Sequence, residues 1–141
     1  MSNDQRILGI DYGTRRIGIA ISDPMGIIAQ GLCTIDNDED TCEAVEDIIR
    51  DQHVGRIVVG VPYAPDGGLG RKGEEVMEFL DRLRAHVDVP VETWDESFTT
   101  VEAHRQLRAA GMKKKRRGEK GRADEMAARI LLQEYLEHGG A

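Results

Sequence analysis

The chain has 141 residues, of which 40% are hydrophobic and 32% charged, and its formal net charge is −7. This length predicts one domain, residues 1–141, and no apolar run is long enough to span a bilayer. Met1 to Arg6 is not a signal peptide, and Cys33 and Cys42 alone cannot form a disulfide framework. These features exclude membrane-spanning and disulfide-stapled secreted proteins and predict a soluble, cytoplasmic one.

The first part of the chain predicts two strands joined by a turn. Residues 6–10 are mostly apolar, 12–15 have turn chemistry, and isoleucines then alternate with small residues over 17–22. This pattern places Asp11 at the end of the first strand. A carboxylate there is costly to desolvate unless it is paired, hydrogen-bonded or metal-bound. An aspartate that only accepts amide hydrogen bonds in the turn is the alternative.

The remaining periodicity predicts strands over 27–33, 56–61 and 89–94. Helices are expected to follow the capping residues 37–40 and end near Gln52, and to cover about 73–86, 99–110 and 121–138. The order βββαβαβαα is a meander followed by crossovers. It predicts an α/β fold with a five-stranded mixed sheet and helices on both faces, which is the pattern of the ribonuclease H-like fold.

A glycine-rich loop over 62–73 follows the strand that ends at Val61. Its segment from Gly68 to Gly73 satisfies G-x-G-x-x-G, but a dinucleotide-binding motif begins directly at a strand end. We therefore exclude dinucleotide binding here. Arg71 and Lys72 open the next helix and are candidates for phosphate contact.

Charge is distributed unevenly along the chain. Acidic residues cluster between Asp36 and Asp51, whereas seven of the nineteen lysines and arginines lie within 113–122. Phosphate binding depends on the local field more than on net charge, so we expect a nucleic-acid partner. A solubilising loop would carry the same charges. The candidate phosphate contacts are Arg15, Arg71, Lys72, Lys113, Lys114, Lys115, Arg116, Arg117 and Arg122.

Three acidic residues lie at the edges of predicted elements: Asp11, Glu96 (beside Asp95) and Asp124 (beside Glu125). If the first and fifth strands end on one rim and the last helix crosses it, these carboxylates converge and need a cation to offset their repulsion. Oxygen ligands select hard ions such as Mg²⁺ or Mn²⁺, which in pairs promote phosphodiester cleavage. We predict that these three acids are catalytic and metal-binding.

The sequence resembles the YqgF family, whose members are named pre-16S rRNA nucleases and Holliday-junction resolvases. The resemblance covers nearly the whole chain and rests on the order and spacing of several motifs: Gly9-Ile10-Asp11-Tyr12-Gly13, Arg16-Ile17-Gly18-Ile19-Ala20, Ser22-Asp23, Val59-Gly60-Val61-Pro62, Asp66-Gly67, Asp95-Glu96 with Thr99-Thr100, Asp124 ahead of Ala127-Ala128, and residues 130–136. It implies a ribonuclease H-like fold, Mg²⁺-dependent nuclease activity, and acidic site residues at Asp11, Glu96 and Asp124.

The chain departs from the family pattern at two places. Ser97 stands where the family has arginine, so Arg15, Arg71 or Arg122 must supply the missing guanidinium if that arginine contacts phosphate. Tyr63-Ala64 replaces the usual Leu-Asn pair, which changes the polar contacts available in that loop.

The sequence thus predicts a metal-dependent endonuclease that processes the 5′ end of precursor 16S rRNA, with a Holliday-junction resolvase as the alternative. An actin-like phosphotransferase would need a second domain to enclose its nucleotide, and this chain has room for one. A non-catalytic nucleic-acid-binding module is the remaining alternative, although phosphate binding alone gains nothing from clustered carboxylates. The protein is expected to be a monomer or a homodimer.

Overall fold

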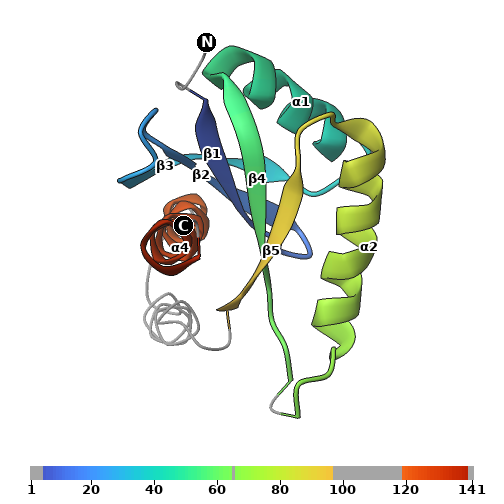
Figure 1. Ribbon diagram of the computed structural model, residues 1–141. Helices are drawn as coiled ribbons and strands as arrows, with labels where there is room; N and C mark the ends of the chain where they lie inside the picture. The colour runs from blue at the N-terminus through green and yellow to red at the C-terminus, as the bar shows by residue number, and fades with distance from the viewer. Residues whose placement is uncertain (1–4, 65, 97–118, 140–141) are drawn as a thin grey trace.

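The computed structural model describes residues 5–64, 66–96 and 119–139. In this part of the chain one sheet is covered by α1 and α2 on one face and by α4 on the other (Figure 1). Its strands are β1 (Arg6–Asp11), β2 (Arg16–Ser22), β3 (Ala29–Asp36), β4 (Val54–Val61) and β5 (Val91–Asp95). The helices are α1 (Thr41–Gln52), α2 (Arg71–His86) and α4 (Glu119–His138). No helix in these ranges is long and apolar enough to cross a membrane.

The sheet is five-stranded and mixed, in the order β3-β2-β1-β4-β5. The pairs β1–β2 and β2–β3 are antiparallel, because short turns join these strands. The pairs β1–β4 and β4–β5 are parallel, because α1 and α2 provide the crossover connections. The predicted fold class is therefore confirmed.

Side-chain alternation divides the core between the two faces of the sheet. Leu8 and Ile10 belong to the larger cluster, which packs under α1 and α2 with Val45 and Phe79. Residues at the intervening positions, such as Gly9, face α4 instead, because successive strand residues point to opposite faces. A smaller cluster under α4 includes Val58, Ala128 and Leu132.

Several predicted boundaries shift in the structure. The third strand begins at Ala29 and continues to Asp36, while Ile27 and Ile28 are each 57% exposed in the preceding turn. The reason is Asp23, whose carboxylate accepts backbone N–H groups from Met25, Ile27 and Ile28 and so holds them in the turn. The predicted starts at residues 56, 73, 89 and 121 move to 54, 71, 91 and 119. The expected helix over 99–110 lies outside the described residues.

Helix α4 lies close to the sheet. Ala127 and Ala128 are buried against it, and their small side chains permit a short separation. A Cβ added to Gly9 would come within 2.8 Å of the Leu132 Cβ, and one added to Gly18 would overlap the backbone of Asp124. Glycine at these strand positions therefore allows the approach of the helix, which brings Asp124 directly over β2.

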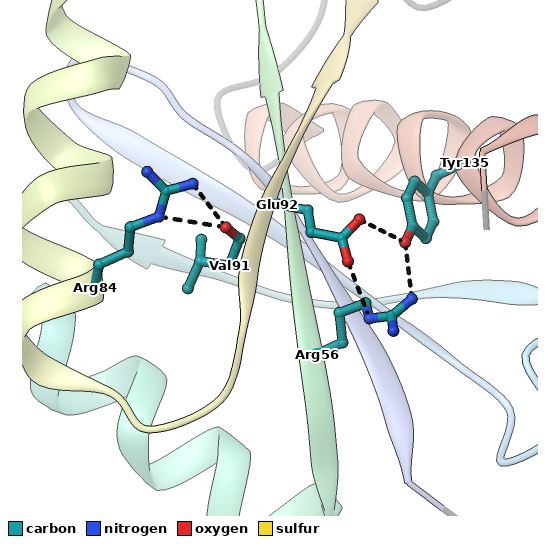
Figure 2. Close-up of polar contacts among 5 residues, drawn as sticks. All are labelled: Arg56, Arg84, Val91, Glu92 and Tyr135. Carbon is teal, nitrogen blue, oxygen red and sulfur yellow. Dashed lines mark hydrogen bonds and ion pairs between the residues drawn. The ribbon is translucent and has the colours of Figure 1, made fainter.

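Polar contacts attach the C-terminal half of α4 to β4 and β5 (Figure 2). The Tyr135 hydroxyl donates to Glu92 Oε1 at 3.0 Å and accepts from Arg56 Nη1 at 3.1 Å. Arg56 Nε also lies 3.2 Å from Glu92 Oε2. Burial raises the pKa of the Tyr135 phenol, and the hydrogen bond from Arg56 opposes that rise. On the other face, Arg84 Nη2 donates to the Val91 carbonyl at 2.8 Å and ties α2 to β5.

Candidate active site at the carboxyl ends of the strands

Asp11 ends β1 and is 8% exposed. It is paired in register with Gly18 of β2, and the pairing of Ile10 with Val59 places Gly60 of β4 on its other side. Residues side by side on neighbouring strands project to the same face of a sheet. The side chain of Asp11 therefore projects from the α4 face of the sheet, with a glycine on the neighbouring strand on either side.

Glu96 follows β5 and is 2% exposed. Its Oε1 occupies the space that a Cβ on Gly60 would take, so its carboxylate lies over the row that contains Asp11. Asp95, in contrast, is paired with Val61, which belongs to the cluster under α1 and α2. The structure thus selects Glu96, and not its neighbour, as the acid on the side of Asp11.

Asp124 lies near the start of α4, with its backbone carbonyl over Gly18. Its Oδ2 accepts from Arg16 Nε at 2.8 Å. The adjacent Glu125 points toward β3, where its Cβ lies 3.2 Å from the position of a Cβ on Gly31. Of these two acids, Asp124 is therefore the one beside the site.

The three predicted acids thus lie along one row of the sheet, Gly18–Asp11–Gly60, on the α4 face. The donor set fits a hard cation, because it offers only carboxylate oxygens and two of its members are almost fully buried. Within the described residues, no three histidine, cysteine or acidic side chains come close enough to hold one ion. The carboxylate of Asp124 is instead paired with a guanidinium.

The predicted phosphate contacts are distributed over different parts of the molecule. Arg15 is exposed in the β1–β2 turn, close in sequence to the row of acids. Arg71 and Lys72 are exposed at the start of α2, which covers the face opposite to the Asp11 side chain. Residues 113–117 lie outside the described residues, and Arg122 lies in α4 at a position whose side chain is not described.

Arg16 is the residue that the sequence analysis missed. It lies two residues before Gly18 in β2 and therefore projects to the same face as Asp11. This parity was a usable signal in the sequence. Whether Arg16 meets an acid on that face depends on α4 crossing β2 at that point, which only the structure reveals.

The fold is that of RuvC resolvases: the structure of Thermus thermophilus RuvC in complex with a Holliday junction aligns with a TM-score of 0.59 at 14% identity, over 96% of both chains. A fowlpox virus Holliday junction resolvase aligns with a TM-score of 0.53 at 12% identity, over 94% of this chain and 99% of that one. At such identities the likeness establishes the fold alone.

The family follows from the sequence match. Residues 5–138 match the family model RuvX, described as Holliday junction resolvase, and the chain belongs to this RuvX/YqgF family. A Halothermothrix orenii protein named "Putative pre-16S rRNA nuclease" is 44% identical over 135 residues, 94% of this chain and 95% of that protein. A Bacteroides fragilis protein of the same name is 41% identical over 133 residues, 94% and 96% of the two chains. The resemblance to the YqgF family is confirmed.

Proposed function

We propose that the chain is a metal-dependent endonuclease that hydrolyses phosphodiester bonds in structured RNA and processes the 5′ end of precursor 16S rRNA. The observation that carries the proposal is the alignment of Asp11, Glu96 and Asp124 over one row of the sheet, on the face where α4 closes over β2. Relatives more than 40% identical that carry the name of a pre-16S rRNA nuclease support the choice of substrate.

Asp11, Glu96 and Asp124 would hold Mg²⁺ or Mn²⁺ in this proposal. When bound, such an ion supplies activation of water and stabilisation of the leaving oxygen. The burial of Asp11 and Glu96 favours this role, because two carboxylates so little exposed interact strongly with any cation that reaches them.

The basic residues would contact the phosphate backbone. The segment 113–117 precedes Arg122 and Asp124 in the sequence by only a few residues, which is the reason to include its cations among the candidate contacts. Arg15 lies in the turn between the strands that carry Asp11 and Gly18. Arg71 and Lys72 begin a helix on the other face and would contact only a substrate that extends around the sheet edge. Such contacts position a substrate without reading its sequence.

A second candidate function is the resolution of Holliday junctions. It is favoured by the RuvX family match and by the RuvC fold. Both activities would use the same carboxylates, so the choice between them depends on the substrate and not on the chemistry.

The experiment compares cleavage of a precursor 16S rRNA 5′ leader and of a four-way DNA junction in Mg²⁺. We expect the leader to be cleaved by the wild type. Asp11→Asn, Glu96→Gln and Asp124→Asn should each lose more than the roughly 100-fold that removing an outer-shell partner of a metal costs. Asp95→Asn is the matched control, because Asp95 adjoins Glu96 in sequence but projects to the other face.

The outcomes separate the alternatives. Cleavage of the junction alone would identify a resolvase, and nucleic-acid binding without cleavage of either substrate would identify a binding module. Activity that survives in all three variants, or that Asp95→Asn also abolishes, would refute the assignment of the site.

A further inference from the structure

The ion pair between Arg16 and Asp124 joins two elements that are 108 residues apart, at the edge of the row of acids. Its exposed fractions are 37% for the Arg16 side chain and 28% for that of Asp124, so both partners can be reached from solvent. The other arginine–carboxylate pairs in the described part of the chain, Arg50 with Asp47 and Arg56 with Glu92, involve none of the three acids of the candidate site.

The backbone that carries Arg16 is held in place by β3 and the segment after it. Arg16 is paired with Asp36 at the end of β3. Asn37 then donates its backbone N–H to the Arg15 carbonyl at 2.9 Å and its side-chain amide to the Gly13 carbonyl at 2.8 Å. A change of partner by Arg16 would therefore require only rotation of its side chain.

We propose that Arg16 neutralises Asp124 while no metal ion is bound, and that its guanidinium contacts a phosphate of the nucleic acid once a cation takes over Asp124. The inference rests on the proposed function of the same site. It makes Arg16 a positioning residue for the substrate, and it adds Arg16 to Arg15, Arg71 and Arg122 as a candidate to replace the arginine that is missing at position 97.

The first step depends on competition between two cations for one carboxylate. A half-exposed ion pair is weak, so it is readily exchanged. A divalent ion on Asp124 would also lie within a few ångström of the guanidinium, and the two positive charges repel each other. Arg16 should therefore lower the affinity of the site for divalent ions.

The second step depends on the donors of the guanidinium. In the described part of the chain only Nε of Arg16 is engaged, which leaves the Nη1 and Nη2 groups for an incoming ligand. A guanidinium presents these donors as a planar fork that matches two phosphate oxygens. A phosphate bound there would lie beside Asp11 and Asp124, where the scissile bond must be placed.

The test measures metal binding and nucleic-acid binding separately, without cleavage. Calorimetric titration with Mn²⁺ compares the wild type with Arg16→Gln and with Arg50→Gln, which removes an exposed arginine–aspartate pair on α1. We expect Arg16→Gln to bind Mn²⁺ about tenfold more tightly, from the loss of charge repulsion. Arg50→Gln should stay within about twofold of the wild type, since distant exposed charges are screened.

Fluorescence anisotropy of a labelled stem-loop RNA in Ca²⁺ measures the second step. Arg16→Gln should weaken RNA binding and flatten its logarithmic salt dependence by about 0.9 for a duplex contact or about 0.7 for a single-stranded one. Arg16→Lys keeps the positive charge but lacks the planar pair of guanidinium donors. It should keep the weaker Mn²⁺ binding of the wild type but recover the RNA affinity only in part.

The results can overturn the proposal independently of the nuclease assay. Weaker Mn²⁺ binding by Arg16→Gln would mean that Arg16 only orients Asp124, and no Mn²⁺ binding by the wild type would remove the competition altogether. An unchanged salt slope would refute the phosphate contact. If both binding results are as expected but the wild type cleaves neither substrate, only the proposed function fails.

Discussion

Replacing Gly18 by alanine tests the close approach of α4 on which the geometry of the site depends. The new Cβ would overlap the backbone carbonyl of Asp124 and lie 3.2 Å from its Cα. These are backbone atoms of a helix and cannot rotate away, so α4 must move off the sheet or β2 must bend. Overpacking of this kind costs about 1–3 kcal/mol. At about 4 °C per kcal/mol for a chain of this size, the melting temperature should fall by about 4–12 °C.

Two further glycines calibrate this prediction. A Cβ on Gly60 would meet the Glu96 carboxylate and the Leu131 methyl carbons at 3.0 and 3.1 Å, and these side-chain ends can rotate. Gly60→Ala should therefore cost about 1 kcal/mol or less. Gly70 has a φ of −83° and no atom within 4 Å of the added carbon, but it is the N-cap of α2, where alanine is less favourable than glycine, so Gly70→Ala should cost about 0.5 kcal/mol.

Urea and thermal unfolding in EDTA measure the series, with near-ultraviolet circular dichroism as a check on the fold. We expect destabilisation in the order Gly18→Ala, then Gly60→Ala, then Gly70→Ala. If Gly18→Ala is destabilised no more than Gly60→Ala, α4 is not held against β2 at this point. The argument that the helix positions Asp124 over the row of acids would then be wrong.

The remaining predictions concern charge and hydrogen bonding. Asp11→Asn should raise the melting temperature in EDTA because it removes the charge repulsion between Asp11 and Glu96, the two buried acids, and Mg²⁺ should stabilise it less than the wild type. A melting temperature below that of the wild type in EDTA would instead make Asp11 a hydrogen-bonding turn residue. Amide donors of Ile28, Ile27 and Met25 lower the pKa of Asp23, so its stabilising effect is present above the ordinary carboxyl pKa and is lost as pH falls through the lowered one. Asp23→Asn should accordingly unfold at lower urea than the wild type near neutral pH and match it in strong acid. Tyr135→Phe should cost about 1 kcal/mol in urea unfolding, and an unchanged midpoint would mean that its contact with Glu92 contributes nothing. Alanine at Lys113, Lys114 and Lys115 should reduce the salt slope of RNA binding by about 0.7–0.9 per lost phosphate contact, whereas an unchanged slope would indicate a solubilising loop.

The strands and their succession along the chain could be predicted because they follow from local periodicity. Ile17, Ile19 and Ile21 alternate with small residues, and this pattern alone identifies β2 and the face that packs under α1 and α2. The pattern misplaced the start of β3, because Ile27 and Ile28 are apolar but are held in a turn by Asp23. The apolar side chains there favour a strand, whereas hydrogen bonds to the Asp23 carboxylate favour a turn. Hydrophobic periodicity takes no account of such side-chain hydrogen bonds.

The sequence by itself determined that Asp11, Glu96 and Asp124 stand at the edges of elements, because the end of an apolar run is a local property of the chain. The tertiary structure supplied the reason why one acid of each neighbouring pair lies on the side of Asp11, since strand register places Glu96 there and Asp95 on the other face. It also decided the partner of Arg16, because the contact with Asp124 requires a helix 108 residues away to cross β2 over Gly18. Local patterns report where a side chain can project, whereas its neighbours depend on segments that meet only when the chain folds.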